Sequence, residues 1–200
     1  MGGQKRCGRA HLIAGTSSAD YPGSVAPDNS TLAFVRISGD TSADIYTLSL
    51  DGDPHVQPII EGKGYEGGPQ FSPEGKWLAY VSDKDGPFQV YVRPFPNGKD
   101  TLVSTDGGTQ PRWNPNNQEI FYREGDKMMA VSLSASPDLR LFQPHILFER
   151  KYNFTSVTYP NYDVSRDGQR FLMVKPRSDS GQLTLVFNWT EELKRRVPAK

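Results

Sequence analysis

The fold is decided by a phrase near the middle of the chain, residues 68–83, which reads GPQFSPEGKWLAYVSD. In this phrase a Pro-Glu-Gly turn joins a short segment to a longer, continuous apolar run. Related phrases occupy residues 25–35, 111–122 and 164–174. Copies spaced by about 40–50 residues are typical of propellers and solenoids, in which each repeat is one supersecondary unit.

One repeat, residues 66–104, predicts four short antiparallel strands separated by turns. Pro and Gly favour the first turn, and the dipeptides Asp-Gly and Asn-Gly favour the two later turns. Four such strands at even spacing make one propeller blade. The predicted strands are Pro69–Ser72, Trp77–Ser82, Phe88–Val92 and Thr101–Ser104.

The second strand of each repeat is a continuous apolar run. A sheet that is wet on one face would alternate polar and apolar residues instead. We therefore expect sheets covered on both faces, as in blades that stack around a common axis. The four runs are residues 32–35, 78–81, 120–122 and 171–174.

The predicted fold is all-β: a β-propeller with four blades of four antiparallel strands, followed by a short C-terminal helix. Residues 188–198 predict the helix, because Asn188 is a candidate N-cap with Glu191 three residues later and Pro198 ends the pattern. Four-bladed rings lie at the small end of the known range, so the repeats could also belong to a larger ring.

The two ends of the domain bear on whether the ring closes. The last repeat lacks an outer strand, whereas residues 11–14 have the character of an outer strand without a blade of its own. Pairing between the two would hide an open edge and close the ring. Residues 1–10 are predicted as a disordered or artificial start, and residues 11–200 as one propeller domain.

The composition argues against several classes of function. Lys plus Arg equals Asp plus Glu at 23 each, so the neutral chain offers no electrostatic case for nucleic acid or an anionic membrane. No apolar run approaches the roughly 18 residues of a membrane span. A single cysteine, Cys7, rules out an intrachain disulfide and a cysteine-rich zinc site. We expect no cofactor and no metal.

The phrase at residues 68–83 resembles the TolB-type propeller repeat of bacterial proteins, and the match continues at residues 90–95 and 104–113. The resemblance covers about residues 11–198 and implies a bacterial propeller, without deciding between periplasm and cytoplasm. Asn29 and Asn117 stand where the family usually has a turn Gly. Asn also tolerates left-handed backbone conformation, so the turn is expected to survive.

The end of the chain resembles the closing segment of one bacterial subgroup, at residues 162–173 and 188–198. In that subgroup the propeller is often the C-terminal, sensor-like half of a larger protein, commonly a Ser/Thr protein kinase. This sequence has neither a Gly-rich phosphate loop nor a His-Arg-Asp catalytic loop. Kinase activity is therefore not carried over.

The sequence favours a protein that is not an enzyme, without settling the question. It holds no Gly-x-Ser-x-Gly elbow, and its histidines, His11, His55 and His145, occupy unrelated repeat positions. The Asp-rich segments at residues 51–53 and 83–86 fit turn geometry and lack the Glu of a calcium-binding loop. No catalytic and no metal-binding residues are predicted.

The candidate binding residues come from comparing the repeats position by position. Structural positions match between repeats, whereas the polar residues beside them vary at the start of each inner strand. We expect these positions to surround the mouth of a central channel, where a rigid ring presents varied polar groups to a ligand. The candidates are Gln70, Gln110, Arg112, Asn161, Tyr162 and Asp163.

These features predict a non-catalytic binding or scaffolding module for a protein or peptide partner. Two alternatives stay open. One is a hydrolase that uses a polar cluster at the channel, because propellers also host enzymes and a fold does not decide function. The other is a self-assembling propeller fragment, a homo-oligomer in which open blade edges pair with another copy.

Overall fold

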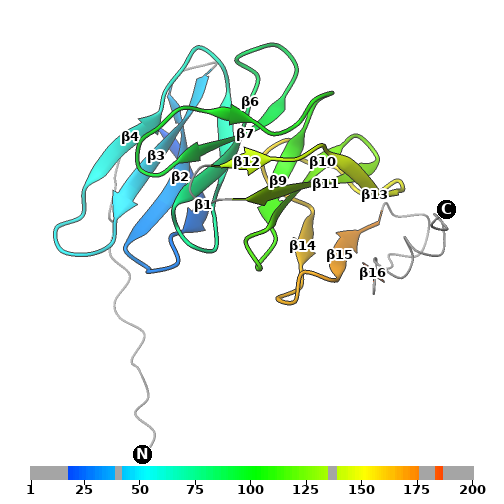
Figure 1. Cartoon of the computed structure of the whole chain (residues 1–200). Helices are drawn as coiled ribbons and strands as arrows, with labels where there is room; N and C mark the ends of the chain where they lie inside the picture. Colours follow the sequence, from blue (N-terminus) through cyan, green and yellow to red (C-terminus); the bar gives the residue numbers. More distant parts are fainter. Residues whose placement is uncertain (1–17, 39–41, 135–138, 176–182, 187–200) are drawn as a thin grey trace, which may run out of the picture.

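The computed structural model describes residues 18–38, 42–134, 139–175 and 183–186. Their strands form four antiparallel sheets that follow one another along the chain, and we call these sheets blades 1 to 4 (Figure 1). Blade 1 contains, in hydrogen-bonded order, β1 (Ala19–Val25), β2 (Thr31–Ser38), β3 (Ser42–Ser49) and β4 (Val56–Ile60). Blade 2 contains β5 (Glu66–Phe71), β6 (Trp77–Ser82), β7 (Gln89–Pro94) and β8 (Thr101–Leu102).

The two later blades depart from this simple pattern. In blade 3 the strands β9 (Thr109–Trp113), β10 (Glu119–Glu124) and β11 (Lys127–Ser134) are followed by two short outer strands, β12 (Arg140–Leu141) and β13 (His145–Glu149). Both outer strands pair with β11. Blade 4 contains β14 (Tyr162–Val164), β15 (Phe171–Val174) and β16 (Leu183–Val186).

The predicted all-β fold is confirmed, and in the repeat of residues 66–104 each predicted strand overlaps an observed one. The second strand, Trp77–Ser82, coincides with β6. The predicted helix at residues 188–198 and the ring-closing strand at residues 11–14 lie outside the described residues. Closure of the ring therefore stays a prediction.

The turn that defines the repeat has the same backbone hydrogen bond in all four blades. In blade 2 the Gly75 amide donates to the Ser72 carbonyl at 2.8 Å. The equivalent 2.8 Å bonds run from Asn29 to Ala26, from Asn117 to Asn114 and from Gly168 to Ser165. The four donors have φ of 62°, 74°, 60° and 70° for residues 29, 75, 117 and 168. The prediction that Asn maintains this turn is confirmed, because Asn29 and Asn117 adopt the same left-handed conformation as the glycines.

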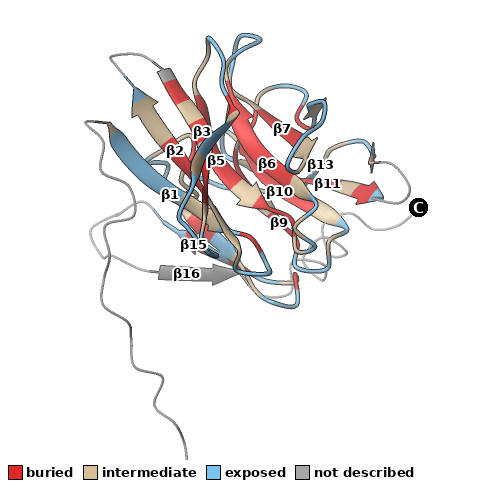
Figure 2. Cartoon of the chain, turned by 90° about the vertical axis from the view of Figure 1, so that its left-hand side faces the viewer, coloured by how far each residue is buried: buried red, intermediate tan, exposed pale blue. Residues whose placement is uncertain are grey.

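The core lies between the blades. Three separate clusters of buried apolar side chains fill the junctions between blades 1 and 2, 2 and 3, and 3 and 4. Buried residues run along β6 and β10 without alternation (Figure 2). This burial confirms that the second strands of blades 2 and 3 are covered on both faces, because each blade is packed between two neighbours.

The same prediction is wrong for the second strand of blade 4. Phe171 and Met173 in β15 are buried against blade 3, whereas Leu172 and Val174 are each 38% exposed. Val81, which holds the position of Val174 in blade 2, is 0% exposed. Among the described residues, only blade 3 packs on this apolar run, so one of its faces is covered. A continuous hydrophobic strand predicts two covered faces, but the layer over the second face must come from another part of the protein.

Candidate functional site

The first strand of each blade is its inner strand. A connecting segment, residues 153–161, crosses the starts of the inner strands β5 and β9, and we call it the strap. Thr158 of the strap lies against the backbone of Gly67 and Gly68 in β5. Tyr159 packs against Tyr21 of β1, with ring centroids 6.1 Å apart. The strap thereby contacts blades 1 and 2, although it enters from blade 3 and continues into blade 4.

Gln110 of β9 is the main anchor of the strap. Its backbone amide donates to the Val157 carbonyl at 3.1 Å, and its side-chain amide donates to the carbonyl of Ser156. Its Oε1 accepts from the backbone amide of Asn161 at 3.4 Å. Gln110 is 0% exposed and has φ of 56°, a left-handed conformation that is uncommon for a residue other than glycine.

Tyr162 and Asn161 also use their polar side-chain atoms in internal hydrogen bonds. The Tyr162 hydroxyl donates to the carbonyls of Gln110 at 2.8 Å and of Phe121 at 3.3 Å. Burial raises the pKa of the Tyr162 phenol above its ordinary value of 10, so the hydroxyl remains protonated. Asn161 Oδ1 accepts from the amide and the hydroxyl of Thr155 at 2.9 and 2.8 Å. The bonds of Asn161 hold the strap together, whereas the Tyr162 hydroxyl joins β14 to β9 and β10.

The other three candidates meet in one pocket of about 300 Å³ at the opposite ends of the inner strands. Gln70, Arg112 and Asp163 line it from blades 2, 3 and 4, and Pro27 adds a wall from blade 1. We call this space the axial pocket, because every blade contributes to it. The six predicted residues thus separate into a strap group and a pocket group. A role in ligand binding stays a prediction for all six.

Arg112 is the best-fixed charged group of the axial pocket. Its Nη1 donates to Gln70 Oε1 at 2.8 Å, and its Nε is buried without a partner in the described structure. The neighbouring Trp113 donates its indole N–H to the Gln70 carbonyl at 2.9 Å and so joins blade 3 to blade 2. Asp163 is exposed, and its Oδ1 accepts from the Val164 amide at 2.9 Å. The pocket therefore offers one oriented cation and one accessible anion.

The sequence comparison missed the apolar walls of this pocket. Pro27, Pro73 and Pro115 line it, and each is the second residue of the repeated turn. Their recurrence at one repeat position was the available signal. Turn chemistry alone explains this recurrence equally well, because proline suits such a turn wherever the turn lies.

The described part of the chain adds little to the case for catalysis or metal binding. Of the residues that line the axial pocket, none is a histidine or a cysteine. The described residues contain no group of three or more His, Cys, Asp or Glu side chains placed to hold a metal ion. Among the same residues, no helix is long and apolar enough to cross a membrane.

Comparison with known proteins agrees with the propeller fold. A model of the family described as TolB beta propeller domain matches residues 6–143. The chain belongs to the TolB β-propeller family. A related TolB propeller sequence is the Tol-Pal system protein TolB of Desulfosudis oleivorans, which is 33% identical over 114 residues, or 56% of this chain and 24% of the relative. An uncharacterized peptidase of Bacillus subtilis is 28% identical over 104 residues, or 48% of this chain and 16% of the relative.

Solved structures show the same TolB-like fold. TolB from Acinetobacter baumannii superposes with a TM-score of 0.64 at 18% identity, covering 88% of this chain and 43% of that one. A puromycin-hydrolyzing peptidase of Mycobacterium tuberculosis superposes with a TM-score of 0.57 at 14% identity, covering 90% and 30%. These low identities show a shared fold alone. The chain spans about a quarter of the length of the TolB of Desulfosudis oleivorans.

Proposed function

We propose that this propeller is a non-catalytic binding module that docks a protein or peptide partner at the axial pocket. The observation that carries the proposal is the convergence of all four blades on one pocket in which Arg112 is oriented by Gln70. A guanidinium held by a neighbour loses little freedom on binding a ligand, so it is preorganised for recognition.

The chemistry of the pocket favours a carboxylate on the partner. Arg112 presents the only cation among the lining residues that the structure describes, between walls of Pro73 and Pro115. Guanidinium groups bind carboxylates with paired, charge-assisted hydrogen bonds. Asp163 stands at the same pocket and would favour a cationic or amide group next to that carboxylate. An Asp or Glu side chain, or a C-terminal carboxylate, fits a space of about 300 Å³.

The test is a peptide array that compares internal Asp or Glu, a free C-terminus and an amidated C-terminus. Peptides that bind are then measured in solution by fluorescence anisotropy. Arg112→Ala is expected to weaken binding roughly tenfold or more, since a hydrogen bond to a charged group is lost. Lys99→Ala, which removes an exposed cation from the turn between β7 and β8, is the matched control. Equal affinity of the wild type and the Arg112 variant would refute the proposal.

Self-assembly is the second candidate, and the exposed face of blade 4 favours it. Leu172 and Val174 together leave an apolar surface where blades 2 and 3 have a covered one. Burial of such a face against a second copy would be stabilising. Molar mass from light scattering tests this candidate: we expect a dimer or larger species that Leu172→Asp converts to monomer. A wild-type monomer at all concentrations would exclude it.

A further inference from the structure

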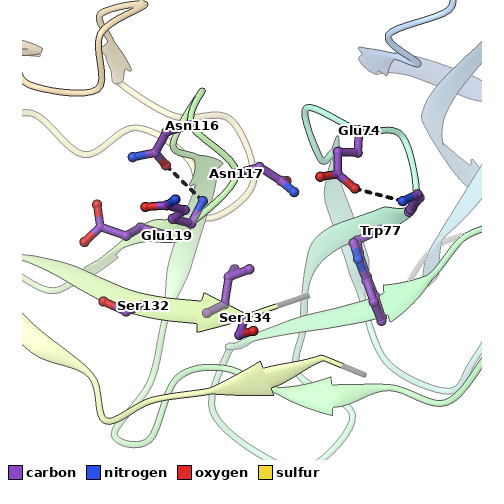
Figure 3. Close-up of a pocket in the computed structure, with 10 residues that line it drawn as sticks. Glu74, Trp77, Asn116, Asn117, Glu119, Ser132 and Ser134 are labelled. Carbon is purple, nitrogen blue, oxygen red and sulfur yellow. Dashed lines mark hydrogen bonds and ion pairs between the residues drawn. The ribbon is translucent and has the colours of Figure 1, made fainter. Parts of the chain in front are cut away.

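A second, larger depression lies between blades 2 and 3, and the proposed function does not use it. It has a volume of about 840 Å³ and is lined by the repeated turns of both blades and by the end of β11 (Figure 3). We call it the inter-blade groove. Trp77 stands on its blade 2 side, and Asn117, Glu119 and Ser134 stand on its blade 3 side.

The walls of the inter-blade groove are polar. Trp77 and Leu133 are its only apolar side chains among the described lining residues, and Leu133 is only 7% exposed. The other lining groups are amides, hydroxyls, two carboxylates and one amine. The amine of Lys76 pairs with Glu74 at 3.1 Å, so the Glu119 carboxylate leaves the lining with one net negative charge. A half-buried indole surrounded by donors and acceptors is therefore the main feature of the groove.

Two polar atoms beside the groove lack partners. Trp77 Nε1, a donor, and Asn117 Oδ1, an acceptor, are both buried without a hydrogen bond in the described structure. The Asn117 side chain extends from blade 3 toward the turn that carries Glu74 (Figure 3). Unsatisfied buried groups are destabilising, and a ligand in the groove would complete the Asn117 amide once that side chain turns outward.

Glu119 adds a carboxylate whose orientation is fixed. Its Oε2 accepts from Asn114 Nδ2 at 2.9 Å, and Asn114 is itself 0% exposed. In β10, Glu119 lies directly opposite Ser132 of β11, so a carboxylate and a hydroxyl are side by side on the blade 3 wall. Carboxylates are strong acceptors for ligand hydroxyl groups.

We propose that the inter-blade groove binds a saccharide, with the sugar ring stacked on Trp77 and its hydroxyls bonded to Asn117 and Glu119. A sugar combines an apolar face with hydroxyls that both donate and accept, which matches one aromatic ring among mixed polar groups. A phosphate ligand fits poorly because two carboxylates face the groove. A protein partner fits less well because its anchor side chains need a deep apolar pocket.

The test follows the indole N–H signals of the three tryptophans in a ¹⁵N-labelled protein by NMR. Trp77→Phe identifies the Trp77 signal by its loss. Cellobiose, maltose and diacetylchitobiose are the probes, because they present different hydroxyl patterns. We expect at least one probe to shift the Trp77 signal in a saturable manner at millimolar concentration, while the Trp113 signal, bonded to Gln70, stays in place.

Asn117→Gly is the decisive variant. Glycine suits the φ of 60° at this position, so the turn is retained while the unpaired amide is removed. The variant should bind the saccharide roughly fivefold or more weakly at an unchanged melting temperature. Arg112→Ala should leave saccharide binding intact, which separates this proposal from peptide binding at the axial pocket.

Three results would overturn the assignment. One is the lack of any saturable Trp77 shift with all three probes up to about 50 mM, a limit that corresponds to binding too weak to be specific. The other is an equal affinity of the wild type and Asn117→Gly. Binding of peptides but not of saccharides in the same titration would also count against it.

Discussion

The indole N–H of Trp113 in blade 3 donates a hydrogen bond to the backbone carbonyl of Gln70 in blade 2, at 2.9 Å. A corresponding contact joins blade 2 to blade 1, where the Phe71 amide donates to Ser24 Oγ at 2.9 Å. These polar contacts supplement the apolar clusters between the blades. They also set the position of Gln70, the residue that orients Arg112 in the axial pocket.

Trp113→Phe should lower the free energy of unfolding by about 1–3 kcal/mol, because the Gln70 carbonyl loses its donor and the junction loses packing. Denaturant unfolding measures the change. Trp77→Phe is the matched control, since the Trp77 indole N–H has no partner in the described structure. Equal losses from both variants would show that the inter-blade hydrogen bond contributes nothing.

Gln110→Ala should be more destabilising than Gln110→Gly. Both variants remove the amide that holds the strap, but alanine also keeps a side chain at a φ of 56°, where L-residues are strained by about 1–2 kcal/mol. We expect the alanine variant to lose about 2–4 kcal/mol in total and the glycine variant roughly 1 kcal/mol less. Chemical denaturation measures both. A glycine variant no more stable than the alanine variant would contradict a strained backbone.

Gly68→Ala should displace the strap. A methyl group at Gly68 would approach the Thr158 carbonyl oxygen to 2.6 Å, and φ there is +61°. Gly86→Ala is the control, because its φ is +121° while nothing lies within 4 Å of the added carbon. Hydrogen exchange should therefore rise at residues 153–161 in the Gly68 variant alone. An unchanged exchange pattern there would mean that the strap does not depend on this contact.

Glu66→Gln should change how stability depends on pH. Glu66 is 1% exposed, and its Oε2 has no partner in the described structure. Burial raises the pKa of this carboxyl above its ordinary value of 4.5, with further contributions from Asp44 and Asp83. The folded state thus binds the proton more tightly than the unfolded state. The stabilisation that results is complete below the unfolded pKa and is lost as pH rises through the folded pKa.

The glutamine variant keeps an acceptor for the Ser82 hydroxyl, which donates to Glu66 Oε1 at 3.0 Å, but it carries no ionisable proton. It should therefore be more stable than the wild type near pH 7, with a difference that shrinks toward pH 4. Unfolding in denaturant across this pH range measures the effect. Glu74→Gln, at an exposed turn position, should show no such trend. Parallel curves for the Glu66 variant and the wild type would refute the raised pKa.

The elements of the fold were predictable because each depends on neighbours in the sequence. The turn at Pro73-Glu74-Gly75 and its equivalents at Asn29 and Asn117 follow from local backbone preferences, and the structure shows one hydrogen bond pattern at all of them. The continuous apolar run at residues 78–81 predicted a blade covered on both faces. These signals repeat along the chain, so each copy supports the others.

The candidate site was predictable only in part. Gln70, Arg112 and Asp163 meet in the axial pocket, as equivalent positions of adjacent repeats should. The sequence also predicts Gln110 as an accessible polar residue at the channel, yet this residue is buried beneath the strap. No repeat contains the strap, so periodicity carried no information about it. The inter-blade groove was missed because it combines the turns of blades 2 and 3 with the end of β11, and a comparison of equivalent repeat positions does not group these residues.

The sequence by itself determined the repeat, the strands and the turn in each blade, because hydrophobic period and backbone preference act over a few residues. Only the tertiary structure decided which polar side chains stay accessible and which are consumed by internal hydrogen bonds. It also decided that Leu172 stays half-exposed while its counterpart Ala79 is fully buried. The physical reason is that burial depends on the layer packed against a side chain, and that layer comes from a distant part of the chain.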